Sequence, residues 1–175
     1  MDAKRLGIYL SDHHAASVAG IELARRTEVE NHSNPVGHFL AGLIPELRED
    51  QHTLEAVMRV LVVRGDVLKS RVAWALEKVG RLKLNGSWVR YSPLSRLVEL
   101  EALCSATEGR ISLWSTLARL QLQDLRLSAF DFEILIARAE VQKSALHRLR
   151  ARAADVAFAD AATPFGAGET AIASY

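Results

Sequence analysis

Cysteine, proline and aromatic residues are scarce in this chain of 175 residues, and each scarcity excludes a class of structure. The single cysteine, Cys104, excludes an internal disulfide and a cysteine-rich metal site. A lone cysteine also fits a reducing compartment. With only four prolines and abundant Ala, Leu, Arg and Glu, the composition favours helix.

Net charge and long apolar runs are also lacking. The formal net charge is +1, so the charge indicates neither a nucleic-acid partner nor a membrane partner. No apolar run approaches the roughly 18 residues of a membrane-spanning helix. Ser11, Asp12, His13 and His14 interrupt the stretch where a secretory signal would be apolar. We therefore expect a cytoplasmic protein.

One charged residue stands on an otherwise apolar helix stripe in the stretch from Phe39 to Leu61. The stripe follows three- and four-residue steps, which is typical of an amphipathic helix, and it consists of Leu40, Leu43, Leu47, Leu54, Met58 and Leu61. Asp50 falls on this stripe. Burying an unpaired carboxylate costs several kcal/mol, so the sequence predicts that another group forms an ion pair or hydrogen bond with Asp50.

The same periodicity predicts four long helices, at about residues 6–26, 36–62, 93–120 and 128–158. Pro45 lies inside the second helix, and because the stripe keeps its phase across it, we expect one kinked helix. Ser92 and Pro93 are a cap and a first helical residue for the third. In the first helix, Ala16, Ser17 and Gly20 are small, so a neighbouring backbone can come close.

The connection between the second and third helices is long, about 30 residues from Val63 to Ser92. It holds a shorter amphipathic segment, 66–80, and an Asn85-Gly86 turn. That turn indicates either a small hairpin or, as we favour, an irregular connection with Trp88 and Tyr91 packed on the bundle. Residues 159–175 form a small-residue tail that we expect to be flexible, which leaves residues 1–158 as a single helical-bundle domain.

A long middle connection lets the third helix run parallel to the second, as in a ferritin-like four-helix bundle with one crossover. On these helix and connection lengths the chain resembles the ferritin-like superfamily, and more specifically uncharacterised bacterial helical-bundle proteins placed near it. The resemblance covers about residues 6–158. It implies an all-α bundle with a crossover between helices two and three.

The resemblance also raises the question of a di-iron site, which in this superfamily uses a Glu on two helices and Glu-x-x-His on the other two. The sequence has one such match, Glu49 to His52. Both residues fall opposite the apolar stripe, so we expect them to be exposed. The fourth helix offers Glu133 and Glu140, but neither is followed by a His at the required spacing. These departures argue against a di-iron site.

A different polar set is predicted to face inward. His13, Asp50 and Gln142 fall on the stripes of three helices and form a predicted buried polar layer, with His13 the first candidate partner of Asp50. Glu101 and Glu108 lie at the edge of the third stripe. His13, Asp50, Glu101 and Glu108 have the ligand types of a divalent transition metal such as iron, manganese or zinc. The alternative, which we favour, is a hydrogen-bond network that fixes helix register.

The helical pattern places two further residues at or near the surface of the bundle. His14 is expected at the surface or the boundary of the bundle, and Arg138 on the outer side of the fourth helix.

The functional hypothesis follows from the lack of a complete catalytic constellation. We expect a non-enzymatic bundle without a cofactor that acts by interaction, with a second copy of itself or with another protein, and Trp88, Val89 and Tyr91 are candidates for the interface. The alternative is a ferritin-like metal-binding protein with an atypical ligand set, acting in metal handling or the response to oxidative stress.

Overall fold

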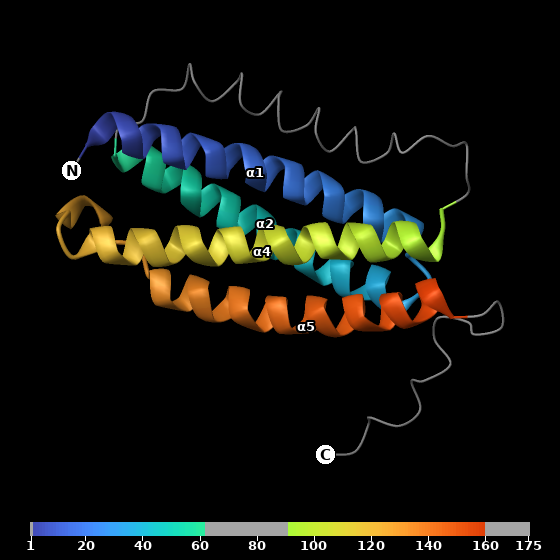
Figure 1. Ribbon diagram of the computed structural model, residues 1–175. Coiled ribbons are helices and arrows are strands. Elements are labelled where there is room, and N and C mark those ends of the chain that lie inside the picture. The colour runs from blue at the N-terminus through green and yellow to red at the C-terminus, as the bar shows by residue number, and fades with distance from the viewer. Residues whose placement is uncertain (1, 62–90, 160–175) are drawn as a thin grey trace, which may run out of the picture.

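Long helices make up the part of the chain that the computed structural model describes, residues 2–61 and 91–159 (Figure 1). They are α1 (Ala3–Glu30), α2 (Pro35–Val60), α4 (Pro93–Gln121) and α5 (Phe132–Phe158), with a short 3-10 helix, η1 (Leu125–Leu127), between the last two. Within the described ranges there is no strand, so the all-α prediction is confirmed. The predicted segment 66–80, the Asn85-Gly86 turn with Trp88, and the tail from residue 160 onward lie outside the described residues.

The helices are arranged as two antiparallel pairs, α1 with α2 and α4 with α5 (Figure 1). Helix α4 also lies beside α1 and runs in the opposite direction. The hydroxyl of Tyr9, near the start of α1, lies 3.3 Å from Oγ1 of Thr116, near the end of α4. At the other end, Arg26 Nη2 lies 3.1 Å from Oε1 of Glu99. Helices α2 and α4 therefore run in the same direction.

Capping side chains set where the helices begin. Asn34, Ser92 and Asp131 each accept a hydrogen bond from a backbone N–H of the first turn of α2, α4 and α5. A proline follows directly in the first two, where the missing N–H has no intrahelical partner to lose. Pro45 lies inside α2, which continues through it as one helix.

Two apolar clusters fill the bundle, one toward each end. The first gathers side chains such as Leu40, Leu100 and Leu146 beside the α1–α2 turn. The second gathers side chains such as Leu10 and Phe132 near the α4–α5 connection. Between them, at the middle of the helices, polar side chains from α2, α4 and α5 meet in the interior. None of the helices described has a stretch long and apolar enough to cross a membrane.

A buried asparagine joins the α1–α2 turn to the start of α4. The amide nitrogen of Asn31 donates to the carbonyl of Thr27 at 2.8 Å and to the hydroxyl of Tyr91 at 2.7 Å. Its amide oxygen accepts from Nε of Arg96. Tyr91 in turn donates to Glu99 at 3.0 Å, so this tyrosine is fixed to the bundle by polar contacts.

Gly37 marks the closest backbone approach at this corner. A Cβ added there would lie 2.1 Å from the carbonyl oxygen of Asn31. Gly42, one and a half turns further along α2, has open space at the same position. Substitution of Gly37 therefore tests this close approach, and substitution of Gly42 is its control.

We predict that Gly37→Ala lowers the free energy of unfolding by about 1–3 kcal/mol, because the methyl group forces the backbone of Asn31 away. Gly42→Ala should raise it by up to about 1 kcal/mol, since alanine favours helix over glycine. Urea denaturation of both variants measures the difference. Equal effects of the two substitutions would show that the Asn31 turn has room to move.

Candidate functional site

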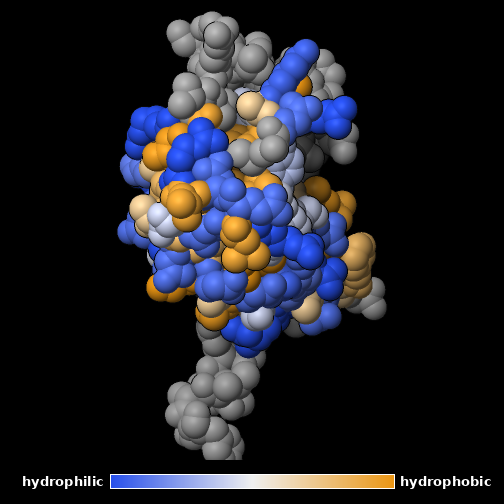
Figure 2. All heavy atoms as spheres, turned by 90° about the vertical axis from the view of Figure 1, so that its left-hand side faces the viewer, coloured by the Kyte–Doolittle hydropathy of each residue, from blue (hydrophilic) through white to orange (hydrophobic). Residues whose placement is uncertain are grey.

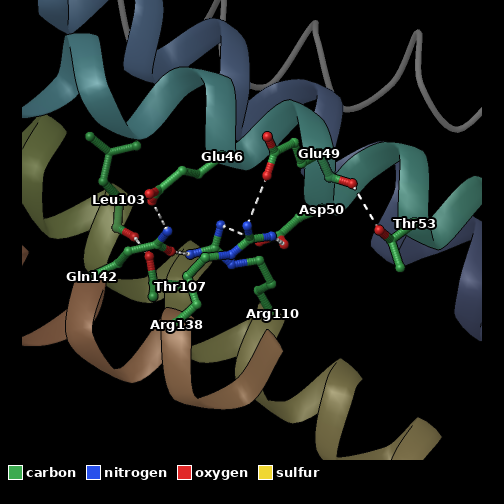
Figure 3. Close-up of polar contacts among 9 residues, drawn as sticks. All are labelled: Glu46, Glu49, Asp50, Thr53, Leu103, Thr107, Arg110, Arg138 and Gln142. Atoms are coloured by element: carbon green, nitrogen blue, oxygen red, sulfur yellow. Dashed lines mark hydrogen bonds and ion pairs between the residues drawn. The ribbon is translucent and has the colours of Figure 1, made fainter. Parts of the chain in front are cut away.

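Asp50 is the centre of the polar layer between the two apolar clusters (Figure 3). Its side chain is buried, and it faces two arginines from other helices. Oδ2 of Asp50 lies 3.0 Å from Nη1 of Arg110 on α4. Oδ1 accepts a hydrogen bond from Nη2 of Arg138 on α5. The carboxylate of Asp50 is thus paired with two arginine side chains and not with a histidine.

Gln142 extends the layer along α5 and is also buried. Its amide oxygen accepts from Nη2 of Arg110, and its amide nitrogen donates to Oε2 of Glu46 on α2. Arg138 makes a further bond, from Nη1 to Oε2 of Glu49 at 2.9 Å. The network joins α2, α4 and α5 (Figure 3).

Burial and neighbouring charges shift the pKa values of the groups in this layer in opposite directions. Burial raises the pKa of Asp50, although Arg110 and Arg138 oppose the shift. Burial likewise lowers the pKa of Arg110, against the pull of Asp50. For Arg138, burial alone would lower the pKa, but its hydrogen bonds to Asp50 and Glu49 outweigh burial and raise it. In each of the three groups, the ion pairs therefore oppose the effect of burial on the pKa.

The structure corrects the placement of the two histidines of α1. His14, expected near the surface, is buried, and its Nε2 lies 3.0 Å from Oε1 of Glu55 on α2. His13, expected to pair with Asp50, is half-buried and packs against the ring of Tyr9 at a centroid distance of 4.5 Å. Burial lowers the pKa of His13. Helix α1 contacts both α2 and α4, so it buries two sides: Leu10 and Ala24 are buried as expected of the inward stripe, and Ser11 and His14 beside it are buried as well.

The remaining predicted metal ligands lie on the outside. Glu101 and Glu108 are exposed, and they pair with Arg150 at 3.6 Å and Lys143 at 3.3 Å. His13, Asp50, Glu101 and Glu108 are therefore not brought together as a ligand set. Across the described ranges, no group of three or more His, Cys, Asp or Glu side chains could hold a metal ion.

The Glu-x-x-His match lies where its helical phase predicts. Glu49 and His52 are both exposed, while Asp50 between them is buried. The match thus faces away from the interior in which a di-iron site would lie.

Two arginines of the layer were not identified from the sequence. Arg110 falls in phase with Leu103, Trp114 and Leu117, so it too is a charge on an apolar stripe, opposite in sign to Asp50. This phase is the signal that could have found it. Arg138 was assigned to the outer side of α5, and its long side chain reaches inward from the boundary.

Comparison of the chain with protein-family models, curated proteins and solved structures gives no match.

We predict that Asp50→Ala destabilises the fold by about 3–5 kcal/mol, because it leaves Arg110 buried without its partner. The double change Asp50→Leu with Arg110→Met should cost much less than Asp50→Ala. Chemical denaturation followed by circular dichroism measures both.

Glu49→Ala is the matched control, since Glu49 is an exposed partner of Arg138. It should change the stability by less than about 1 kcal/mol. A loss with Asp50→Ala as small as that with Glu49→Ala would mean that the layer contributes nothing to the fold.

Proposed function

We propose that the protein acts by binding another protein surface and not by catalysis. One observation supports the non-catalytic part of this proposal: the buried carboxylate at the centre of the bundle is held by two arginine side chains. Both oxygens of Asp50 face guanidinium groups, so a metal ion at this position would have to displace Arg110 and Arg138 against their charge. This arrangement supports a structural role for the layer.

The proposed fold is a ferritin-like arrangement with a crossover between α2 and α4, in a cytoplasmic protein. Helices α2 and α4 run in the same direction, which supports a connection that returns along the length of the bundle (Figure 1). The buried lone thiol of Cys104 supports a reducing compartment.

The end of the bundle at the α4–α5 connection is the proposed interaction surface. Leu122 and Leu125 are 87% and 88% exposed there. Figure 2 views this end and shows hydrophobic side chains scattered among hydrophilic ones. We define the bundle-end surface by its exposed apolar residues, Ile8, Val60, Leu122, Leu125 and Ile134.

A second copy of the chain is the proposed partner of the bundle-end surface. Charges on it are neutralised locally: Arg126 pairs with Asp124 at 2.6 Å and Arg5 with Asp2 at 3.2 Å. Such a surface combines exposed apolar area with little net charge, so it does not repel its own copy.

We predict that the wild-type protein sediments as a dimer and that Leu125→Asp weakens the dimer at least about tenfold, since a charge replaces buried apolar area. Val141→Asp is the matched control, because Val141 is 72% exposed on α5 away from this surface. It should leave the dimer unchanged. A monomeric wild type, or equal effects of both substitutions, would contradict self-association through this end.

We predict that protein purified without added metal or chelator contains no stoichiometric transition metal by elemental analysis, because arginines occupy the space around Asp50. A stoichiometric amount of iron, manganese or zinc that disappears with Asp50→Asn would instead favour the metal-binding alternative.

A further inference from the structure

A cavity of about 240 Å³ lies beside the polar layer, between α1, α2 and α4. The cavity is lined by His13 on α1, Asp50 on α2 and Arg110 on α4, so it lies at the same height along the bundle as these three residues. The cavity therefore occupies the middle of the bundle, between the two apolar clusters.

Small residues on facing helices keep this space open. Gly20 on α1 and Gly109 on α4 both line the cavity, and a Cβ added to either would meet no atom within 4 Å. The small size of Gly20 would allow a neighbouring backbone to come close, but no atom of the described residues occupies that space. Ala16 and Ala106 line the same space and are exposed, so the cavity opens to solvent between α1 and α4.

The lining of the cavity is mainly apolar, and it includes Leu47, Leu54 and Leu113. Apolar voids are unfavourable, and a molecule that fills one stabilises the folded state. An apolar cavity of about 150 Å³ admits benzene. The larger space here suits an apolar body of about two fused rings.

Two buried donors on α4 give the cavity a polar preference. Trp114 is 1% exposed, and its Nε1 has no hydrogen-bond acceptor among the described residues. The same holds in that part of the chain for Nε of Arg110, whose side chain is 10% exposed. The two residues are four apart, so they lie on one face of α4. Both line the cavity, and buried donors are ordinarily satisfied.

The missing partner is an acceptor without charge. The guanidinium of Arg110 already faces Asp50 and Gln142, and the charges of Arg110 and of the half-buried Arg138 are balanced by Asp50 and Glu49. A ligand carboxylate would add an unbalanced charge to this interior. A carbonyl oxygen satisfies the donors without that charge.

We propose that this cavity binds a small, neutral and largely apolar molecule that carries a carbonyl oxygen, which accepts hydrogen bonds from Arg110 and Trp114. The cavity lies at mid-bundle and the bundle-end surface at the α4–α5 connection. The inference therefore goes beyond the proposed self-association and does not depend on it.

The test uses the bicyclic ketone 1-tetralone as probe, with the hydrocarbon tetralin and with 2-naphthoate as comparisons. Binding to the full chain is measured by calorimetry and by the shift in melting temperature. We expect 1-tetralone to bind at least about fivefold more tightly than tetralin, because its carbonyl oxygen accepts two hydrogen bonds that the hydrocarbon cannot form. We expect 2-naphthoate to bind more weakly than the ketone.

Two variants locate the site. Gly109→Leu should fill the cavity and abolish binding of 1-tetralone, while the control Gly42→Leu, at an equally open position outside the cavity, should bind it as the wild type does. Trp114→Phe should reduce the preference for the ketone over tetralin, a ratio that a general loss of stability does not change.

The proposal is overturned if the wild type binds neither 1-tetralone nor tetralin, or if Gly109→Leu binds the ketone unchanged. It is also overturned if 2-naphthoate binds more tightly than the ketone, since the site would then select a charge. The oligomeric state of the same samples reports separately on the bundle-end surface.

Discussion

The charge of Asp50 is the constraint on which the middle of this bundle depends. A carboxylate on the buried stripe of α2 is tolerable only if cations reach it, and here they come from α4 and α5. The pairing fixes how these helices lie along one another, because a shift of either by one turn would separate the charges. In the structural role proposed for the layer, the apolar clusters at the two ends supply burial and the ion pairs between them favour one register of the helices.

Much of the bundle is encoded in short stretches of sequence and could be predicted from them. Asn34 and Ser92 start helices through contacts within one turn, and the stripe of α2 has a period that Pro45 does not disturb. Such signals depend on the segment alone. The burial of Asp50 and the exposure of Glu49 follow from the same helical phase, which is why the Glu-x-x-His match could be set aside without coordinates.

The partners in the layer depend on long side chains and on helix rotation, which periodicity resolves poorly. Arg138 starts near the surface and reaches Asp50 through its flexible stem, so its position on the helix does not reveal its contact. His13 and His14 differ by about 100° around α1, and this helix packs on both α2 and α4. Because α1 buries two sides, its sequence pattern allows either histidine to be the buried one. Only the packing of α1 on α2 and α4 determines that it is His14.

The cavity follows from the same network. Arg110 lines the cavity, but its guanidinium faces Asp50 and Gln142, so the side chain does not extend across the space toward α1. At this level α1 presents Ala16 and Gly20, which are too small to replace it. Above and below, Leu10 and Ala24 hold α1 in the two apolar clusters, so the helix cannot move inward to close the gap. An ion pair that orders three helices thus leaves space beside the fourth, and Arg110 and Trp114 of α4 both line that space.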